Sequence, residues 1–196
     1  DIPEAHAVGV SGGGLVCQAL ALDHRDRVIT ISALLSSLLG TGSIDNPNGG
    51  YGDLPSPSPA FLEKLSEFFG KIPADRKPFI EWSLKKYRLI SGSLEPIDQK
   101  AGTVQAGLEF DRARNLSSMN NHALAFAASP KTPISRLNDL DIKTLVVHGT
   151  EDRLLPYGHG EALSQTIPGA HMMTIEKMGH DLPRAAWSRV ISAVLE

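Results

Sequence analysis

The chain begins with a strand pattern, a glycine-rich turn and a helix pattern. Residues His6–Val10 form a short, mostly apolar run that ends at Ser11, and three glycines follow directly. Apolar residues then recur at helical spacing from Leu15 to Leu22, and the next run, Val28–Ile31, is rich in β-branched residues. This order of strand, helix and strand is a βαβ unit, and such units build parallel sheets.

The middle of the chain has a different pattern. Residues Thr41–Pro59 are rich in Gly, Pro, Ser, Asn and Asp, which is typical of a loop. No strand pattern lies between Ser32 and Asp141, and the segments with helical periodicity are Ala60–Phe69, Phe79–Ile90, Gln99–Arg114 and Met119–Ala128. An all-helical insertion inside an α/β frame is typical of a lid or cap.

The α/β alternation returns near the end of the chain. Thr144–His148 and Ala170–Ile175 have strand patterns, and Tyr157–Thr166 and Arg184–Leu195 have helix patterns. We therefore predict the α/β class, with a mainly parallel partial sheet of about four strands and an inserted helical cap. The predicted core comprises residues 1–35 and 141–196, and the predicted cap comprises residues 36–140.

Composition and charge narrow the classes of function. The chain has 196 residues, of which 41% are hydrophobic, and a formal net charge of −3. This charge argues against a nucleic-acid or anionic-membrane surface, and no apolar run approaches the roughly 18 residues of a transmembrane helix. The single cysteine, Cys17, excludes an internal disulfide and a multi-cysteine zinc site.

A candidate nucleophile lies in the turn after the first predicted strand. Gly9-Val10-Ser11-Gly12-Gly13 matches G-x-S-x-G, in which a serine occupies a strained turn between a strand and a helix. Glycines at the two flanking positions allow strand and helix to approach closely. The backbone N–H of Gly12 would point at an oxyanion that develops on the substrate. Walker-type and G-x-G-x-x-G phosphate loops do not fit, because the lysine of the first is absent and Ser11 and Cys17 replace glycines of the second.

A nucleophilic serine needs a general base, and His180 is the best placed of the seven histidines. It follows Met178-Gly179, just after the last predicted strand and before the final helix. Because the carboxyl ends of parallel strands meet at one edge of a sheet, this loop would bring the imidazole to the edge that carries Ser11.

The orienting carboxylate should follow the preceding strand. Both Glu151 and Asp152 qualify, and we prefer Asp152 because the turn directs it inward, whereas Glu151 would be solvated. Asp45, after the earlier strand, is a weaker alternative. Asp139 and Asp141 precede the strand and would lie at the opposite edge of the sheet.

Aromatic residues concentrate in the helical insertion, which contains all six phenylalanines as well as Trp82, Tyr51 and Tyr87. They can form an apolar pocket over Ser11, or they can form the insertion's own core because it lacks a sheet. The candidate substrate-binding residues are Phe79, Trp82, Met119 and His122.

These segments together resemble the α/β-hydrolase superfamily. The resemblance rests on HAVGVSGGG, VVHGTEDRLLP, IPGAH and MGHDLP, which occur in the order of the superfamily's recurring segments. The helical middle is similar to the caps of bacterial esterases of the aclacinomycin methylesterase type. The resemblance implies a catalytic triad of Ser11, Asp152 and His180, an acyl-enzyme intermediate, and neither a metal nor an organic cofactor.

One feature departs from the superfamily pattern. Its members carry further strands and an oxyanion-hole loop before the nucleophile strand, whereas only Asp1–Ala5 precede that strand here. We therefore expect a fragment or a truncated protein that lacks the second oxyanion donor, whose loss costs about 10²–10³ in rate. The first strand would then become an exposed apolar edge, which favours a homodimer.

The leading functional hypothesis is a serine hydrolase that cleaves a carboxylic ester of a small apolar substrate. Haloperoxidase-like activity without a cofactor, thioester hydrolysis, C–C bond hydrolysis and acyl transfer can use the same three residues. A hypothesis from another class is a truncated, non-catalytic binding or scaffold protein. No targeting signal is visible, which favours the cytoplasm, although such a signal would precede Asp1.

Overall fold

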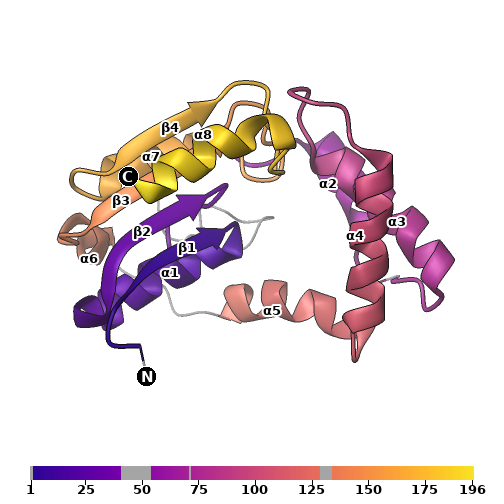
Figure 1. Cartoon of the computed structure of the whole chain (residues 1–196), viewed down its shortest axis with the longest axis horizontal. Helices are drawn as coiled ribbons and strands as arrows, with labels where there is room; N and C mark the ends of the chain where they lie inside the picture. Colours follow the sequence, from indigo (N-terminus) through magenta and orange to yellow (C-terminus); the bar gives the residue numbers. More distant parts are fainter. Residues whose placement is uncertain (1, 41–53, 71, 129–133) are drawn as a thin grey trace.

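The computed structural model describes residues 2–40, 54–70, 72–128 and 134–196 (Figure 1). Its centre is a four-stranded sheet in the order β1-β2-β3-β4, in which all neighbouring strands are parallel. The strands are β1 (Ala5–Val10), β2 (Val28–Leu34), β3 (Lys143–Gly149) and β4 (His171–Ile175). The predicted α/β class and the predicted parallel sheet are confirmed.

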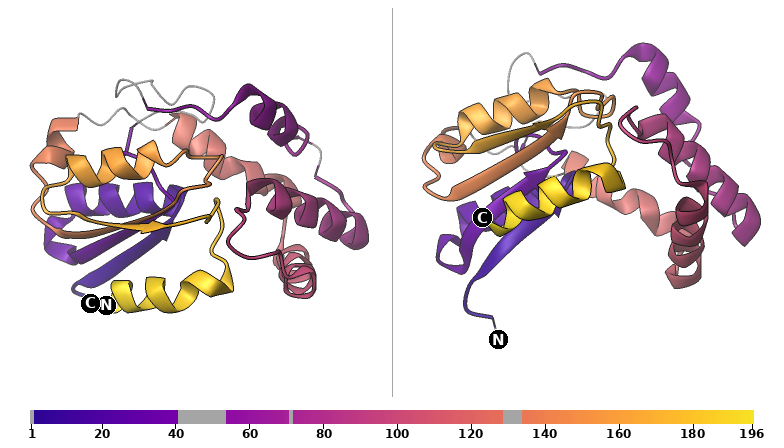
Figure 2. Two further views of the ribbon diagram at one scale, coloured as in Figure 1. Left: turned by 90° about the horizontal axis from the view of Figure 1, so that it is seen from above. Right: turned by 45° about the horizontal axis from the view of Figure 1, so that its top comes forward.

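Helices cover both faces of the sheet (Figure 2). α1 (Gly12–Asp23) and α7 (Gly158–Thr166) lie on one face, and α8 (Arg184–Leu195) lies on the other. On the first face, buried side chains of α1 and α7, such as Ala21 and Leu163, form one core with Ile31 and Val146. On the second face, Val190 and other buried residues of α8 pack in a separate core with strand residues. Two apolar layers therefore hold the strands in place.

The helical insertion lies beyond the carboxyl ends of the strands in Figure 1. Its elements are α2 (Pro59–Ser66), α3 (Arg76–Ile90), α4 (Gln99–Arg112), the 3₁₀ helix η2 (Leu116–Asn120) and α5 (Asn121–Ala128). The side chains of Ser58 and Asp98 cap α2 and α4 by accepting hydrogen bonds from Phe61 N and Ala101 N. No strand lies between β2 and β3 among the residues that are described. The predicted domain boundaries stay a prediction.

One strand end and two short elements differ from the sequence pattern for identifiable reasons. β2 continues to Leu34 because Ser32 and the two residues after it pair with both β1 and β3. α6 (Ile134–Asn138) and the 3₁₀ turn η1 (Arg25–Arg27) were not expected, and both are too short for a periodic pattern to form.

β1 is an edge strand of the described sheet. Its side chains Val8 and Val10 are 51% and 45% exposed, in agreement with an apolar edge. The homodimer that this edge favours stays a prediction. The described helices include none that combines the length and the apolar character needed to cross a membrane.

Candidate active site

Ser11 occupies the turn between β1 and α1 in a backbone conformation that residues other than glycine rarely adopt. Its φ and ψ angles are 54° and −120°, and it directly precedes Gly12, the first residue of α1. Ser11 N donates to Leu34 O at 2.8 Å, and Ser11 O accepts from Ser36 Oγ at 2.8 Å. A strained backbone of this kind persists only where the surrounding structure enforces it. The turn places Ser11 at the carboxyl edge of the sheet.

The glycines around Ser11 are required for a reason that partly corrects the prediction. A Cβ at Gly9 would lie 2.1 Å from Gly13 O, so any side chain there would separate the strand from the helix. A Cβ at Gly14 would lie 2.5 Å from the side chain of Ser36. A Cβ at Gly13 would meet nothing within 4 Å, so the close approach requires Gly9 and Gly14, and not the glycine at position 13.

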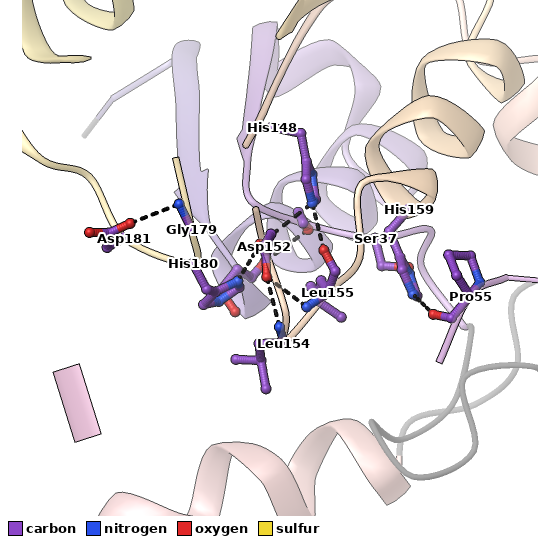
Figure 3. Close-up of polar contacts among 12 residues, drawn as sticks. Ser37, Pro55, His148, Asp152, Leu154, Leu155, His159, Gly179, His180 and Asp181 are labelled. Atoms are coloured by element: carbon purple, nitrogen blue, oxygen red, sulfur yellow. Dashed lines mark hydrogen bonds and ion pairs between the residues drawn. The ribbon is translucent and has the colours of Figure 1, made fainter. Parts of the chain in front are cut away.

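Asp152 lies in the turn that follows β3, and its carboxylate is fully buried. Oδ1 accepts hydrogen bonds from Leu154 N at 2.9 Å and from Leu155 N at 2.8 Å. Oδ2 accepts from His180 Nδ1 at 2.7 Å (Figure 3). The two backbone amides stabilise the charged carboxylate and fix its orientation toward the imidazole.

His180 lies in the loop between β4 and α8, with 7% of its side chain exposed. Its backbone N–H donates to Ile90 O at 2.8 Å, at the end of α3. Since Nδ1 donates to Asp152, the other ring nitrogen, Nε2, is left as a proton acceptor. This is the tautomer that a general base requires.

Backbone hydrogen bonds beyond the strand ends bring the three residues to one edge of the sheet. Ser11 N donates to Leu34 O, Leu35 N donates to Val147 O, and Thr150 N donates to Ile175 O, at 2.8, 2.7 and 3.2 Å. The structure thus joins His180 to Asp152 directly. Among the described residues, no hydrogen bond joins Ser11 Oγ to His180, a bond that in many enzymes tightens only with substrate.

His148, at the end of β3, supports the Asp152 turn and was missed by reasoning from sequence. It is completely buried, and its Nε2 lies 2.8 Å from Leu155 O and 3.5 Å from Asp152 Oδ2. Burial lowers the pKa of His148 below its usual value, so the ring is neutral at neutral pH and Nε2–H donates. The available signal was a histidine in an otherwise apolar strand, four residues before the acid.

His159, on α7, is a second buried histidine outside the Asp152–His180 pair. Its Nδ1 lies 2.7 Å from Ser37 Oγ, and its Nε2 donates to Pro55 O at 2.9 Å (Figure 3). Burial lowers the pKa of His159 as well. Its contacts fasten the segment before α2 to the core.

The two candidate acids have different partners. Asp152 contacts the histidine, whereas Glu151 accepts hydrogen bonds from Ser93 N at 2.7 Å and Ser93 Oγ at 2.8 Å. These bonds lower the pKa of Glu151, which is thus a bound carboxylate and not merely a solvated one. Asp45 lies outside the described residues.

The candidate substrate residues lie in the insertion. Phe79 is completely buried, and its ring centroid lies 5.6 Å from that of Trp82 and 5.4 Å from that of Phe110. These contacts belong to the insertion's own core. Met119 is half-buried on η2, and the side chain of His122 lies outside the described residues. Over the described parts of the chain, no group of three or more potential ligands is arranged to hold a metal ion.

The amino-acid sequence of the chain is similar to those of known proteins. A family model described as the alpha/beta hydrolase fold matches residues 1–183. Rhodomycin D methylesterase DnrP of Streptomyces peucetius is 30% identical over 205 residues, which cover 97% of this chain and 65% of the relative. A 2-hydroxymuconate semialdehyde hydrolase of Pseudomonas putida is 27% identical over 182 residues, covering 91% of this chain and 57% of the relative. The chain therefore spans less than two thirds of the length of these relatives.

Solved structures share the fold at lower identity. The 2-hydroxy-6-oxo-6-phenylhexa-2,4-dienoate hydrolase from Rhodococcus sp. strain RHA1 has a TM-score of 0.65 and 18% identity, covering 99% of this chain and 64% of that one. An esterase from Exiguobacterium antarcticum has a TM-score of 0.67 and 15% identity, covering 96% of this chain and 66% of that one.

Proposed function

The chain belongs to the alpha/beta hydrolase fold family, and from this premise we propose that it acts as a serine hydrolase. Its substrate would be a carboxylic ester of a small apolar molecule, cleaved through an acyl-enzyme intermediate. Ser11 would be the nucleophile, His180 the general base, Asp152 the residue that orients His180, and the Gly12 amide an oxyanion donor.

The observation that carries this proposal is the hydrogen bond of 2.7 Å between His180 Nδ1 and Asp152 Oδ2. The carboxylate is buried, and both of its oxygens accept hydrogen bonds. A solvated surface pair would gain little from such an arrangement, whereas a base that must hold one tautomer and become an imidazolium in each cycle needs it.

The geometry supports a two-step reaction. Ser11 Oγ attacks the ester carbonyl while His180 Nε2 takes its proton, and the Gly12 N–H stabilises the oxyanion. The first N–H groups of a helix have no acceptor within that helix, which leaves the Gly12 N–H available for this role. His180 then protonates the leaving alcohol, and a water molecule activated by His180 releases the acid. Asp152 stabilises the imidazolium in both steps.

The relatives support ester hydrolysis and one second candidate. The methylesterase relative favours an ester substrate. The relative named 2-hydroxymuconate semialdehyde hydrolase favours C–C bond hydrolysis, which the same three residues of this chain would carry out.

A fluorophosphonate probe tests the nucleophile without knowledge of the substrate. The wild-type chain should be labelled, and Ser11→Ala should abolish labelling. His180→Ala should also abolish it, whereas His24→Ala, a change at an exposed histidine after α1, should leave it unchanged. Absence of labelling in folded wild-type protein would support the non-catalytic alternative and refute the proposal.

The reaction class is tested with two substrate panels. Hydrolysis of p-nitrophenyl esters that Ser11→Ala abolishes supports the esterase. Turnover only of a 2-hydroxy-6-oxo-dienoate would refute it in favour of C–C bond hydrolysis.

A further inference from the structure

The loop between α3 and α4, residues 91–98, contacts the loop that carries His180. Directly before this loop, at the last residue of α3, Ile90 O accepts a hydrogen bond from His180 N at 2.8 Å. Leu94 N donates to Lys177 O at 2.9 Å. Lys177 itself has a φ of 62°, a conformation that needs support from its surroundings. The helical insertion therefore holds the base loop at two points of its backbone.

The two loops also touch backbone to backbone at a pair of glycines. A Cβ at Gly92 would lie 2.1 Å from Lys177 O and 2.4 Å from Gly179 N. A Cβ at Gly179 would lie 2.2 Å from Gly92 N. Asp181 Oδ1 accepts hydrogen bonds from Gly179 N at 3.1 Å and Gly92 N at 3.4 Å. No flexible side chain separates the loops, so a displacement of one is passed to the other.

The same α3–α4 loop binds the loop of the acid through one side-chain pair. Ser93 donates from both N and Oγ to the two carboxylate oxygens of Glu151, the residue next to Asp152. Glu151 N in turn donates to Met178 O at 2.9 Å, two residues before His180. With the Ser93–Glu151 pair, the loop that carries Asp152, the loop that carries His180 and the α3–α4 loop each contact the other two.

We propose that Ser93 and Glu151 are positioning residues that hold the Asp152 and His180 loops in register for the reaction. This inference rests on the proposed function, since it assigns to the pair a role in aligning His180 with Ser11. Loss of this alignment would have a measurable effect on catalysis, because a misplacement of about 1 Å in a reacting group can reduce the rate by about 10²-fold.

A purely structural role predicts a different result. The Ser93–Glu151 hydrogen bonds are exposed, so water can take their place when they are lost, and their net contribution to the free energy of unfolding is small. A positioning role therefore predicts a lower kcat at nearly unchanged stability and KM. A structural role predicts a loss of stability alone.

The test measures kcat, KM and the rate of fluorophosphonate labelling in the complete chain. Glu151→Ala removes both hydrogen bonds and should lower kcat and the labelling rate about tenfold, with KM changed by less than about twofold. Ser93→Ala keeps the backbone bond and should have a smaller effect in the same direction. The double variant should equal Glu151→Ala, because the Ser93 hydroxyl then has no partner to lose.

Two conservative variants separate position from charge. Ser93→Thr keeps the hydroxyl, and Glu151→Gln keeps an acceptor oxygen without the negative charge, so both should stay within about threefold of wild type. Ser164→Ala is the matched control, since Ser164 Oγ is likewise exposed but donates to Glu161 O on α7. Wild-type kinetics in Glu151→Ala, additive effects in the double variant, or equal losses in Glu151→Gln and Glu151→Ala would each overturn the proposal.

A measurement that needs no catalytic turnover can show that the positioning role is wrong independently of whether the proposed function is wrong. The NMR signal of the His180 Nδ1 proton, bound to Asp152, should exchange with water about tenfold faster in Glu151→Ala than in wild type. An unchanged exchange rate would contradict the positioning role even in an inactive protein. Full activity in Ser11→Ala would instead overturn the proposed function. Loss of activity in Ser11→Ala together with wild-type activity in Glu151→Ala would overturn only the positioning role.

Discussion

Replacement of Asp152 by asparagine provides the sharpest test of the catalytic arrangement. The Asn side-chain oxygen can still accept from Leu154 N and Leu155 N, which are 2.9 and 2.8 Å from Oδ1 in the wild type. The amide nitrogen would then face His180 Nδ1, which lies 2.7 Å from the original Oδ2. Two N–H donors cannot bond to each other, so His180 must change tautomer and keep its proton on Nε2. In that state it cannot accept the proton of Ser11.

The expected loss in kcat is about 10⁴-fold, the scale known for a triad with the wrong tautomer. This corresponds to roughly 5 kcal/mol of transition-state stabilisation. The assay is steady-state hydrolysis of a p-nitrophenyl ester together with the rate of fluorophosphonate labelling. Circular dichroism should show a folded protein, because the asparagine still satisfies the two backbone amides.

Asp139→Asn is the control for the loss of one carboxylate near the same strand. Asp139 precedes β3, at the end opposite to Asp152, and is exposed. Its replacement should leave both rates unchanged. Activity of Asp152→Asn within about tenfold of the wild type would refute the role assigned to the Asp152–His180 pair.

Three further predictions concern stability. Gly9→Ala should reduce the free energy of unfolding in urea by about 1–3 kcal/mol, because its Cβ would lie 2.1 Å from Gly13 O. Gly13→Ala, which meets open space, should be neutral to within about 1 kcal/mol, and equal losses in the two variants would contradict this account. Phe79→Ala should cost about 3–5 kcal/mol with an unchanged KM, whereas a raised KM at full stability would place Phe79 in a substrate pocket. Stability should also decrease as the pH falls from 7 toward 5, because burial keeps the pKa of His148 and His159 below 6.5, so the unfolded chain binds protons that the folded chain does not. Urea unfolding at both pH values measures this change. The unfolding free energy should depend less steeply on pH in His159→Gln, and an unfolding free energy independent of pH in the wild type would refute the prediction.

Much of the fold could be predicted because short-range patterns report burial. The β-branched run that begins β2 and the apolar run of β3 both form strands of the sheet, and the glycine-rich turn after β1 contains the strained Ser11. His180 follows the last strand, and the rule that parallel strands end at one edge of the sheet placed it at the edge that carries Ser11. These features depend on neighbours in the sequence or on topology alone.

The contacts that complete the site depend on residues far apart in the chain. The hydrogen bonds of Ser93 with Glu151, and of Ile90 with His180, cross between the insertion and the core, so no periodic pattern records them. The aromatic residues of the insertion fit a pocket or a core equally well in the sequence, and only packing showed Phe79 among its own aromatic neighbours.

By itself, the sequence determined the α/β class, the parallel sheet and the serine and histidine that reach one edge, because local chain geometry and burial dictate them. The tertiary structure decided that Asp152, and not Glu151, meets His180, and that Gly14 rather than Gly13 requires the absence of a side chain. The physical reason is that hydrogen bonds and close packing act over a few ångströms in space, whatever the separation along the chain.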